Sequence, residues 1–258
     1  MAPHERHRVE LKTPHRQRGC DVTATAVTPD GPMDLFTAGD PGTARAAVVV
    51  IQEAFGVTSH IERCTTRIAE AGYYAVAPAL FHRLGAPVFA YDNFEPVAPA
   101  MQSLTAEGIR ADLAATTSHL EWLGFTPAST GIVGFCMGGS VALAGATSGS
   151  FGASVSFYGG GVLEGRFGFP PLVELAPQLA CAWLGCYGDL DKGIPVEQVE
   201  ALRAAAASSA QRTELVRYPD AEHGFNCDDR PAVYNPAAAS DAWARMLAFF
   251  AEHLATRS

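Results

Sequence analysis

The chain has 258 residues, of which 48% are hydrophobic and 17% are charged. This length allows one large domain or two small ones, and the apolar content can fill a sizeable core, which excludes wholesale disorder. The formal net charge is −9, whereas a non-specific nucleic-acid binder needs a net basic face. No stretch approaches the roughly 18 consecutive apolar residues of a membrane span. We therefore expect a soluble protein with neither nucleic acid nor a membrane as its partner.

Residues 1–20 are a basic segment with five Arg or Lys and three His. The segment lacks the apolar stretch of a secretory signal, so we interpret it as a flexible arm, with a basic contact arm as the alternative.

The chain has six cysteines but no CxxC motif. Without an export signal, this pattern favours a reducing, cytoplasmic setting over a disulfide framework. No metal-ligand spacing or nucleotide-binding motif occurs, so no metal and no other cofactor is expected.

The predicted elements alternate between strands and helices along residues 21–258, which we interpret as a single domain. Residues 22–36, with Asp30-Gly31 in the middle, predict an antiparallel hairpin at a sheet edge. Strands are predicted at 46–51, 73–78, 131–135, 153–158, 180–186 and 214–218, and helices at 61–71, 105–122, from 140 and at 241–254. Such alternation predicts an α/β fold, with a mostly parallel sheet of about eight strands covered by helices on both faces. Residues 83–104 show little periodicity, which favours a lid or a pocket wall.

A glycine-rich turn, GFCMGG at 134–139, lies between a predicted strand and a predicted helix. It has the form of the nucleophile elbow G-x-S-x-G, with Cys136 in the place of serine. Gly134 and Gly138 are needed because side chains there would collide in the sharp turn. A helix N-terminus favours a thiolate, and the backbone N–H of Met137 would face a developing oxyanion. The alternative is a structural cysteine on a tight turn.

A cysteine nucleophile needs a base and a residue that orients the base, and in this fold the acid and then the histidine follow in sequence. Strand 180–186 is followed by Asp189 and Asp191, and strand 214–218 by His223. Each candidate therefore follows a predicted parallel strand, where the active sites of open α/β sheets gather. The seven other histidines lack this strand-then-turn setting.

The chain resembles the dienelactone hydrolase family, a Cys-His-Asp branch of the α/β hydrolases, from about residue 46 to 254. Four segments carry the resemblance: QEAFG at 52–56, GFCMGG at 134–139, GDLDKGIP at 188–195 and YPDAEHGF at 218–225. The resemblance implies an α/β-hydrolase fold and an ester or lactone hydrolase.

The family's site residues can be matched to positions in this chain. Cys136 matches the nucleophile, His223 the base and Asp191 the orienting acid, with Asp189 as the alternative acid. Glu53 matches a glutamate that helps to activate the thiol; otherwise it is a carboxylate that caps a nearby helix. Ala54 and Met137 match the positions whose backbone N–H groups form the oxyanion hole.

Two arginines that hold the substrate carboxylate in enzymes acting on dienelactone have no counterpart in register. Cys227 stands where one is expected, and no Arg or Lys lies between residues 84 and 108. An unpaired carboxylate is costly to desolvate, so we expect a neutral or apolar activated ester as substrate. The expected pocket side chains are aromatic: Phe81, Phe89, Tyr91, Phe94 and Phe225.

Three alternative functions remain open at this point. The same triad could act on neutral phosphotriesters, as a phosphotriesterase or promiscuous arylesterase, or the protein could be a true carboxymethylenebutenolidase. A non-catalytic thiol sensor is the alternative from another class, and the intact Cys-Asp-His set argues against it. The sequence does not reveal the oligomeric state and is compatible with a homodimer.

Overall fold

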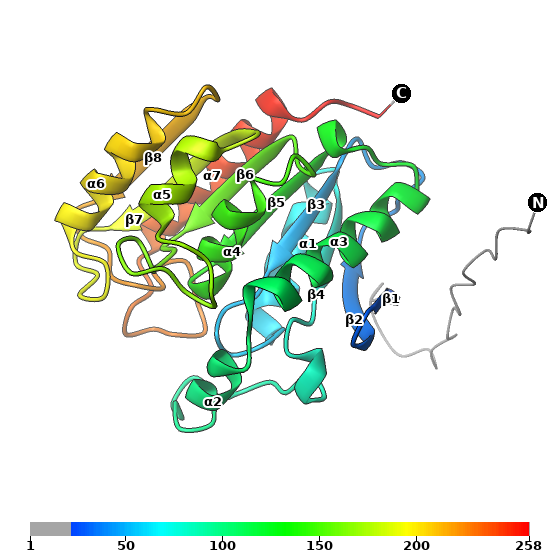
Figure 1. Ribbon diagram of the computed structural model, residues 1–258, viewed down its shortest axis with the longest axis horizontal. Helices are drawn as coiled ribbons and strands as arrows, with labels where there is room; N and C mark the ends of the chain where they lie inside the picture. Colours follow the sequence, from blue (N-terminus) through cyan, green and yellow to red (C-terminus); the bar gives the residue numbers. More distant parts are fainter. Residues whose placement is uncertain (1–21, 258) are drawn as a thin grey trace, which may run out of the picture.

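A computed structural model describes residues 22–257 of the chain (Figure 1). The predicted N-terminal arm, residues 1–20, lies outside these described residues. Eight strands form one sheet in the order β1-β2-β4-β3-β5-β6-β7-β8. Their bounds are β1 Val22–Thr28, β2 Gly31–Ala38, β3 Ala47–Ile51, β4 Tyr74–Pro78, β5 Thr130–Phe135, β6 Ala153–Phe157, β7 Ala182–Gly188 and β8 Thr213–Tyr218. Strands β3 to β8 are mutually parallel, whereas β1 and β2 are antiparallel additions at one edge. The α/β fold predicted from the sequence is confirmed.

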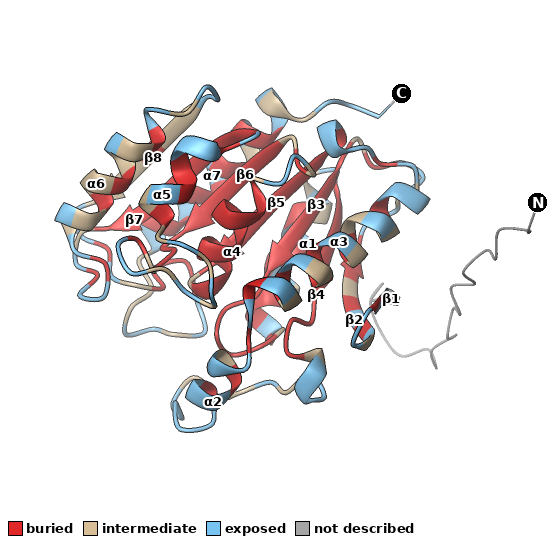
Figure 2. Ribbon diagram, in the orientation of Figure 1, coloured by how far each residue is buried: buried red, intermediate tan, exposed pale blue. Residues whose placement is uncertain are grey.

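Helices cover both faces of this sheet (Figure 1). The α-helices are α1 Ser59–Glu70, α2 Val97–Gln102, α3 Ala106–Trp122, α4 Met137–Gly145, α5 Leu172–Leu175, α6 Val196–Ala206 and α7 Pro236–His253, and the short 3-10 helices are η1 His82–Leu84, η2 Pro127–Ser129 and η3 Ala176–Gln178. Helices α3 to α6 contribute to one hydrophobic core, and α1 and α7 contribute to the other. The two cores lie on opposite faces of the sheet, and Figure 2 shows its central strands buried.

The central strands are continuous apolar runs because both of their faces are covered. All five residues of β3, AVVVI, are buried, as are the six of β5 and the seven of β7. The edge hairpin alternates instead, and its register brings Thr28 opposite Gly31 across the predicted turn. In both kinds of strand, the spacing of apolar residues in the sequence therefore matches the pattern of burial in the structure.

Several helix boundaries differ from the sequence prediction. Helix α7 begins at Pro236 and not at 241, because Asn235 caps it by accepting a hydrogen bond from the Ala238 N–H. Helix α4 begins directly after Cys136, so the catalytic candidate itself occupies the N-cap position. Helix α2 lies inside the segment 83–104, which was expected to be irregular, and α6 was not predicted at all.

Among the described residues, no helix has both the length and the apolar character that a bilayer span requires.

Candidate active site

The sequence-predicted site residues meet at the carboxyl end of the parallel strands. Glu53 follows β3, Cys136 follows β5, Asp191 follows β7 and His223 follows β8. Cys136 has φ 56° and ψ −116°, a conformation that is strained for any residue with a side chain. It is half-buried, so its thiol remains accessible from one side. The sharp turn between β5 and α4 therefore presents the thiol at the carboxyl end of the parallel strands.

Two glycines make this turn sterically feasible. A Cβ atom on Gly134 would lie 1.8 Å from the Gly138 carbonyl oxygen, and one on Gly138 would lie 2.4 Å from the Ile51 carbonyl oxygen. Real Cβ atoms do not approach backbone oxygens this closely. A side chain at 134 would therefore open the turn itself, and one at 138 would displace the elbow from the end of β3. The spacing G-x-C-x-G thus has the steric cause that the sequence suggested.

His223 and Asp191 form a short charged contact beside the thiol. The His223 Nδ1 atom lies 2.6 Å from Asp191 Oδ2, and the carboxylate is almost fully buried. Asp191 Oδ1 accepts hydrogen bonds from the backbone N–H groups of Gly193, at 2.8 Å, and Ile194, at 3.2 Å. Because the carboxylate is fixed from both sides, it can hold the imidazole in one orientation with Nε2 free.

Asp189, the alternative acid, has a different partner. Its two carboxylate oxygens each lie 2.7 Å from a nitrogen of the Arg217 guanidinium. Of the two aspartates, the structure brings only Asp191 to His223.

The surroundings of His223 favour the cationic form of its ring. Burial alone would lower the pKa of His223, but the negative charge of a Cys136 thiolate and the contact with Asp191 outweigh burial and raise the pKa from 6.5 to about 10. The imidazole also contacts the ring of Tyr158, with the centroids 5.1 Å apart. A cationic imidazole beside the elbow would favour the thiolate form that an activated cysteine requires.

Glu53 follows β3 and is buried, and no ion pair within residues 22–257 involves it. Its Oε2 atom accepts a hydrogen bond from the Tyr91 hydroxyl at 3.3 Å, and Tyr91 is in turn 3.0 Å from Thr58 Oγ1. Its Oε1 atom is buried without a hydrogen-bond partner among the described residues. Cys227 lies next to Tyr91 as a neutral thiol, because burial raises the pKa of Cys227 to about 12. Glu53 therefore retains one carboxylate oxygen that accepts no hydrogen bond from the described residues.

Of the two residues whose backbone N–H groups were expected to form the oxyanion hole, Met137 directly follows Cys136 and Ala54 lies on the cavity wall. Met137 is the first residue of α4, so its N–H has no acceptor within that helix. Ala54 belongs to a tight turn, closed by a bridge between Glu53 and Gly56, and it lines the same cavity as Cys136.

This cavity has a volume of about 610 Å³ and contains Cys136, Asp191 and His223 on its wall. Its apolar lining residues are Phe94, Val97, Ala98, Met101, Leu190, Ile194 and Val233. The segment 83–104 thus supplies part of the pocket wall through its helix α2.

The aromatic residues expected in the pocket are distributed differently. Phe94 lines the cavity, whereas Phe81 and Phe225 are fully buried in the two cores. Phe89 packs against Phe81, and the Tyr91 hydroxyl is directed to Glu53. Large rings gain more free energy in a closed core than on an open wall, which is why four of these five residues do not line the cavity.

Sequence reasoning also missed the basic residues of the cavity. Arg166, Lys192 and Arg230 all line it, although none occupies a position of the family's arginines. Arg230 lies 5.8 Å from the Phe55 ring and 5.9 Å from the Tyr91 ring. The glycine-rich run at 159–168, directly after β6, was the available signal for a cavity loop that carries Arg166.

No cluster of three or more His, Cys, Asp or Glu side chains suited to a metal ion occurs within residues 22–257.

The sequence model of the dienelactone hydrolase family matches residues 33–254. The chain belongs to this family. Dienelactone hydrolases act on ester or lactone bonds, and this chain is accordingly a hydrolase of that type. It is 37% identical over 212 residues to a protein of Salmonella typhimurium that is provisionally named carboxymethylenebutenolidase, an alignment that covers 80% of this chain and 77% of that protein. It is 28% identical over 232 residues to the carboxymethylenebutenolidase of Rhodococcus opacus, with 87% of each chain covered.

Solved structures of dienelactone hydrolase type have the same fold. A protein of Klebsiella pneumoniae provisionally named dienelactone hydrolase superposes with a TM-score of 0.77 at 31% identity, covering 91% of this chain and all (100%) of that one. A dienelactone hydrolase-like promiscuous phosphotriesterase from metagenomic libraries superposes with a TM-score of 0.74 at 23% identity, covering 91% of this chain and 99% of that one. At this identity, the second likeness shows only the shared fold.

Proposed function

We propose that this dienelactone hydrolase cleaves carboxylic esters through a thioester on Cys136. The observation that carries the proposal is the 2.6 Å contact between His223 and a buried Asp191, on the wall of the cavity that also holds the Cys136 thiol. Glu53, with one unpartnered buried oxygen, is the proposed additional activator of the thiol.

The reaction would proceed in two stages. The Cys136 thiolate attacks the carbonyl carbon and forms a C–S bond, while the backbone N–H groups of Ala54 and Met137 hold the oxyanion. The C–O bond then breaks, and the leaving alcohol takes a proton from the His223 imidazolium. In the second stage, His223 removes a proton from water, which attacks the thioester and releases the acid and the thiolate. Asp191 stabilises the charged imidazole in both stages.

The proposed substrate is a neutral or apolar activated ester. The predominantly apolar wall and the neutral thiol of Cys227 at one of the family's arginine positions support this choice. Arg166 and Arg230 supply positive charge elsewhere on the wall, so the choice has to be measured against an anionic lactone. A kcat/KM at least tenfold higher for a neutral aryl ester supports it, whereas a strong preference for the lactone would identify a true carboxymethylenebutenolidase.

The same thiolate and oxyanion donors suit attack on the phosphorus centre of a neutral phosphotriester. We therefore include a triester in the substrate panel, where it tests this alternative directly.

The five described cysteines are all free thiols, as the proposed reducing, cytoplasmic setting requires.

Mass spectrometry on the enzyme quenched during turnover of an activated ester tests the nucleophile. We expect an acyl group on the peptide that contains Cys136, and its disappearance in Cys136→Ala. Hydrolysis without an adduct, together with full activity of Cys136→Ala, would refute the proposal and leave a thiol-sensor role for this residue.

A further inference from the structure

The active-site cavity continues into a second hollow. This hollow, called the distal groove here, also has a volume of about 610 Å³. Ala98, Met101 and Arg166 line both the groove and the active-site cavity, so the two spaces adjoin at these residues. The groove alone contacts Gln102, Leu104 and Phe167, and it ends at Thr105, Ala106 and Gly168.

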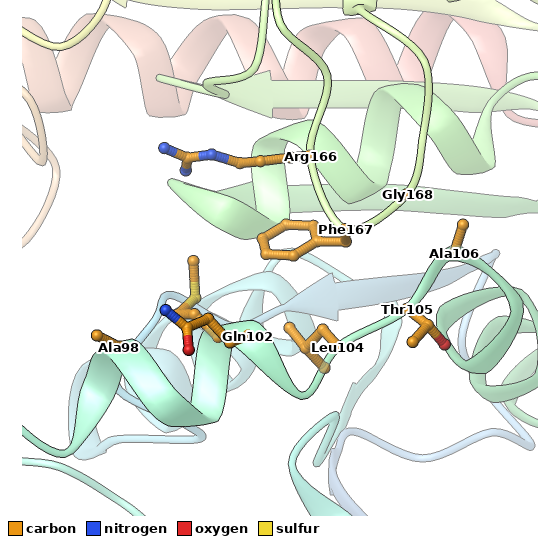
Figure 3. A pocket seen from close by; sticks show the side chains of 9 residues that line it. Ala98, Gln102, Leu104, Thr105, Ala106, Arg166, Phe167 and Gly168 are labelled. Carbon is orange, nitrogen blue, oxygen red and sulfur yellow. The ribbon is translucent and has the colours of Figure 1, made fainter.

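Two separate segments form the walls of the distal groove. Figure 3 shows helix α2 with Ala98 and Gln102 along one wall, and the loop that carries Arg166 and Phe167 along the other. The Phe167 ring projects from this loop toward α2. Leu104, Met101 and Phe167 make the floor and walls largely apolar, and the Arg166 guanidinium marks the junction with the active site. The groove is therefore suited to an apolar chain or ring.

The conformation of Phe167 argues for a role of its ring in the groove. Phe167 has φ 56°, between Gly165 at 71° and Gly168 at 79°. A left-handed conformation is unfavourable for a bulky side chain, and glycine or asparagine would be less strained there. The ring is only half-buried against the neighbouring core, so packing alone is a modest compensation for the strain.

The loop that carries Arg166 and Phe167 is fixed relative to the nucleophile. Ser140, on the helix that begins after Cys136, donates a hydrogen bond of 2.6 Å to the Gly160 carbonyl. The Tyr187 hydroxyl donates to the Gly159 carbonyl at 3.3 Å, and Arg110 of α3 lies 4.8 Å from the Phe169 ring. A wall tied to the elbow helix can hold a substrate tail at a defined distance from Cys136.

At the far end of the groove, the loop that carries Phe167 meets the start of α3. A Cβ atom on Gly168 would lie 3.7 Å from the Ala106 Cβ atom, so the loop passes directly over the start of α3. A tail that grows beyond this point has to leave the groove for solvent. This contact therefore predicts an upper limit to the chain length that is recognised.

We propose that the distal groove binds the apolar tail of an extended ester substrate, whose scissile bond lies at Cys136 and whose tail passes Arg166 to contact Met101, Leu104 and Phe167. The proposal rests on the esterase function proposed above and specifies its substrate class. Each methylene group removed from water is worth roughly a fourfold gain in kcat/KM if its burial is kept in the transition state.

Two ester series test the proposal, one that varies the acyl chain of p-nitrophenyl esters from acetate to decanoate and one that varies the alcohol chain of an activated acid. In the wild type, at least one series should show kcat/KM rising by about tenfold or more from the shortest ester to an optimum of intermediate length, then falling. Gln102→Trp, which fills the groove, should lower the long-to-short ratio of kcat/KM at least about fivefold. Phe167→Gly, which removes the ring and relieves the positive φ, should lower the same ratio.

Gln211→Trp is the matched control, because Gln211 is exposed before β8, at the amino end of the sheet. It should leave the long-to-short ratio at the wild-type value. If kcat/KM falls steadily with length in both series, or if Gln102→Trp and Gln211→Trp give the same ratio, the groove binds no substrate tail. Such a result leaves the esterase function intact as long as hydrolysis of the shortest ester is lost in Cys136→Ala. Loss of that dependence on Cys136 would instead overturn the proposed function itself.

Discussion

His223 Nδ1 and Asp191 Oδ2 lie 2.6 Å apart, and the other oxygen of that carboxylate is bound by two backbone N–H groups. The carboxylate thus cannot rotate without breaking hydrogen bonds on both sides. Since an imidazole held in this way exposes Nε2 toward the elbow, the pair defines the direction in which a proton can move. The order Cys136, Asp191, His223 along the chain is converted into one contiguous site by the crossover topology of the sheet.

Asp191→Asn and Asp189→Asn form a matched pair of variants. The first replaces the aspartate that contacts His223, so we expect kcat to fall by about 10³–10⁴-fold, because the amide favours the wrong imidazole tautomer. The second disrupts the contact with Arg217, which is partly exposed to solvent, and should change the melting temperature little, with kcat within about twofold of the wild type. Steady-state kinetics measure kcat of both variants, and thermal melts measure their stability. Equal losses of kcat would contradict the assignment of Asp191.

Tyr91→Phe removes the hydrogen bond that Glu53 Oε2 receives. Because Oε1 is already without a partner, we expect the free energy of unfolding to fall by roughly 1–2 kcal/mol, and kcat to fall as well. Adding Glu53→Gln to Tyr91→Phe should lower kcat less than it does in the wild type, because Tyr91 acts through Glu53.

Tyr218→Phe is the control for this prediction, because its hydroxyl binds Asp241 at the surface, at 3.0 Å. Denaturant unfolding should show a change within about 0.5 kcal/mol for this variant. Additive effects of Tyr91→Phe and Glu53→Gln on kcat would show that Tyr91 does not position Glu53.

The protonation of His223 gives a prediction about pH. Its pKa is raised to about 10, and the charge of Cys136 is the largest cause that raises it. In Cys136→Ala, burial still disfavours the charged form of the His223 imidazole, and only the contact with Asp191 favours it. The pKa of His223 should therefore fall, which an NMR titration of the ring protons would measure.

The same shift has a consequence for stability. A pKa that is higher in the folded state than in the unfolded state stabilises the folded protein fully below the unfolded value. This contribution is lost as the pH rises from about 6.5 through about 10. The unfolded thiol keeps its own proton up to about pH 8.5, so the stability of the wild type relative to Cys136→Ala should decrease mainly above that pH in denaturant unfolding. A difference that stays constant from about pH 8.5 to about pH 10 would argue against a thiolate-imidazolium pair.

Strands and elbow could be predicted because short-range rules determine them. The buried strands are continuous apolar runs, and the hairpin has Asp30-Gly31 at its turn. Gly134 and Gly138 are required for steric reasons, and the five-residue motif that they bound can be recognised in the sequence. The choice between Asp189 and Asp191 could not be made from strand order alone, because both follow β7. It depends on which carboxylate meets His223 and which meets Arg217 across neighbouring strands.

The cavity wall was the least predictable part. Its residues come from the ends of several strands and from two loops, so no single window of sequence contains them. Aromatic residues near the motifs suggested a pocket, yet Phe81 and Phe225 are buried in the cores, while Arg166 and Arg230 reach the wall from loops whose path depends on tertiary contacts.

The central claim is that Cys136 is the nucleophile, and the most direct measurement compares kcat/KM of the wild type and Cys136→Ala on one activated aryl ester. Both proteins should be folded and should melt at similar temperatures. We predict a loss of at least about a thousandfold, because the attacking atom is absent while the oxyanion donors remain. A Cys136→Ala enzyme that keeps kcat/KM within about twofold of the wild type would contradict the account.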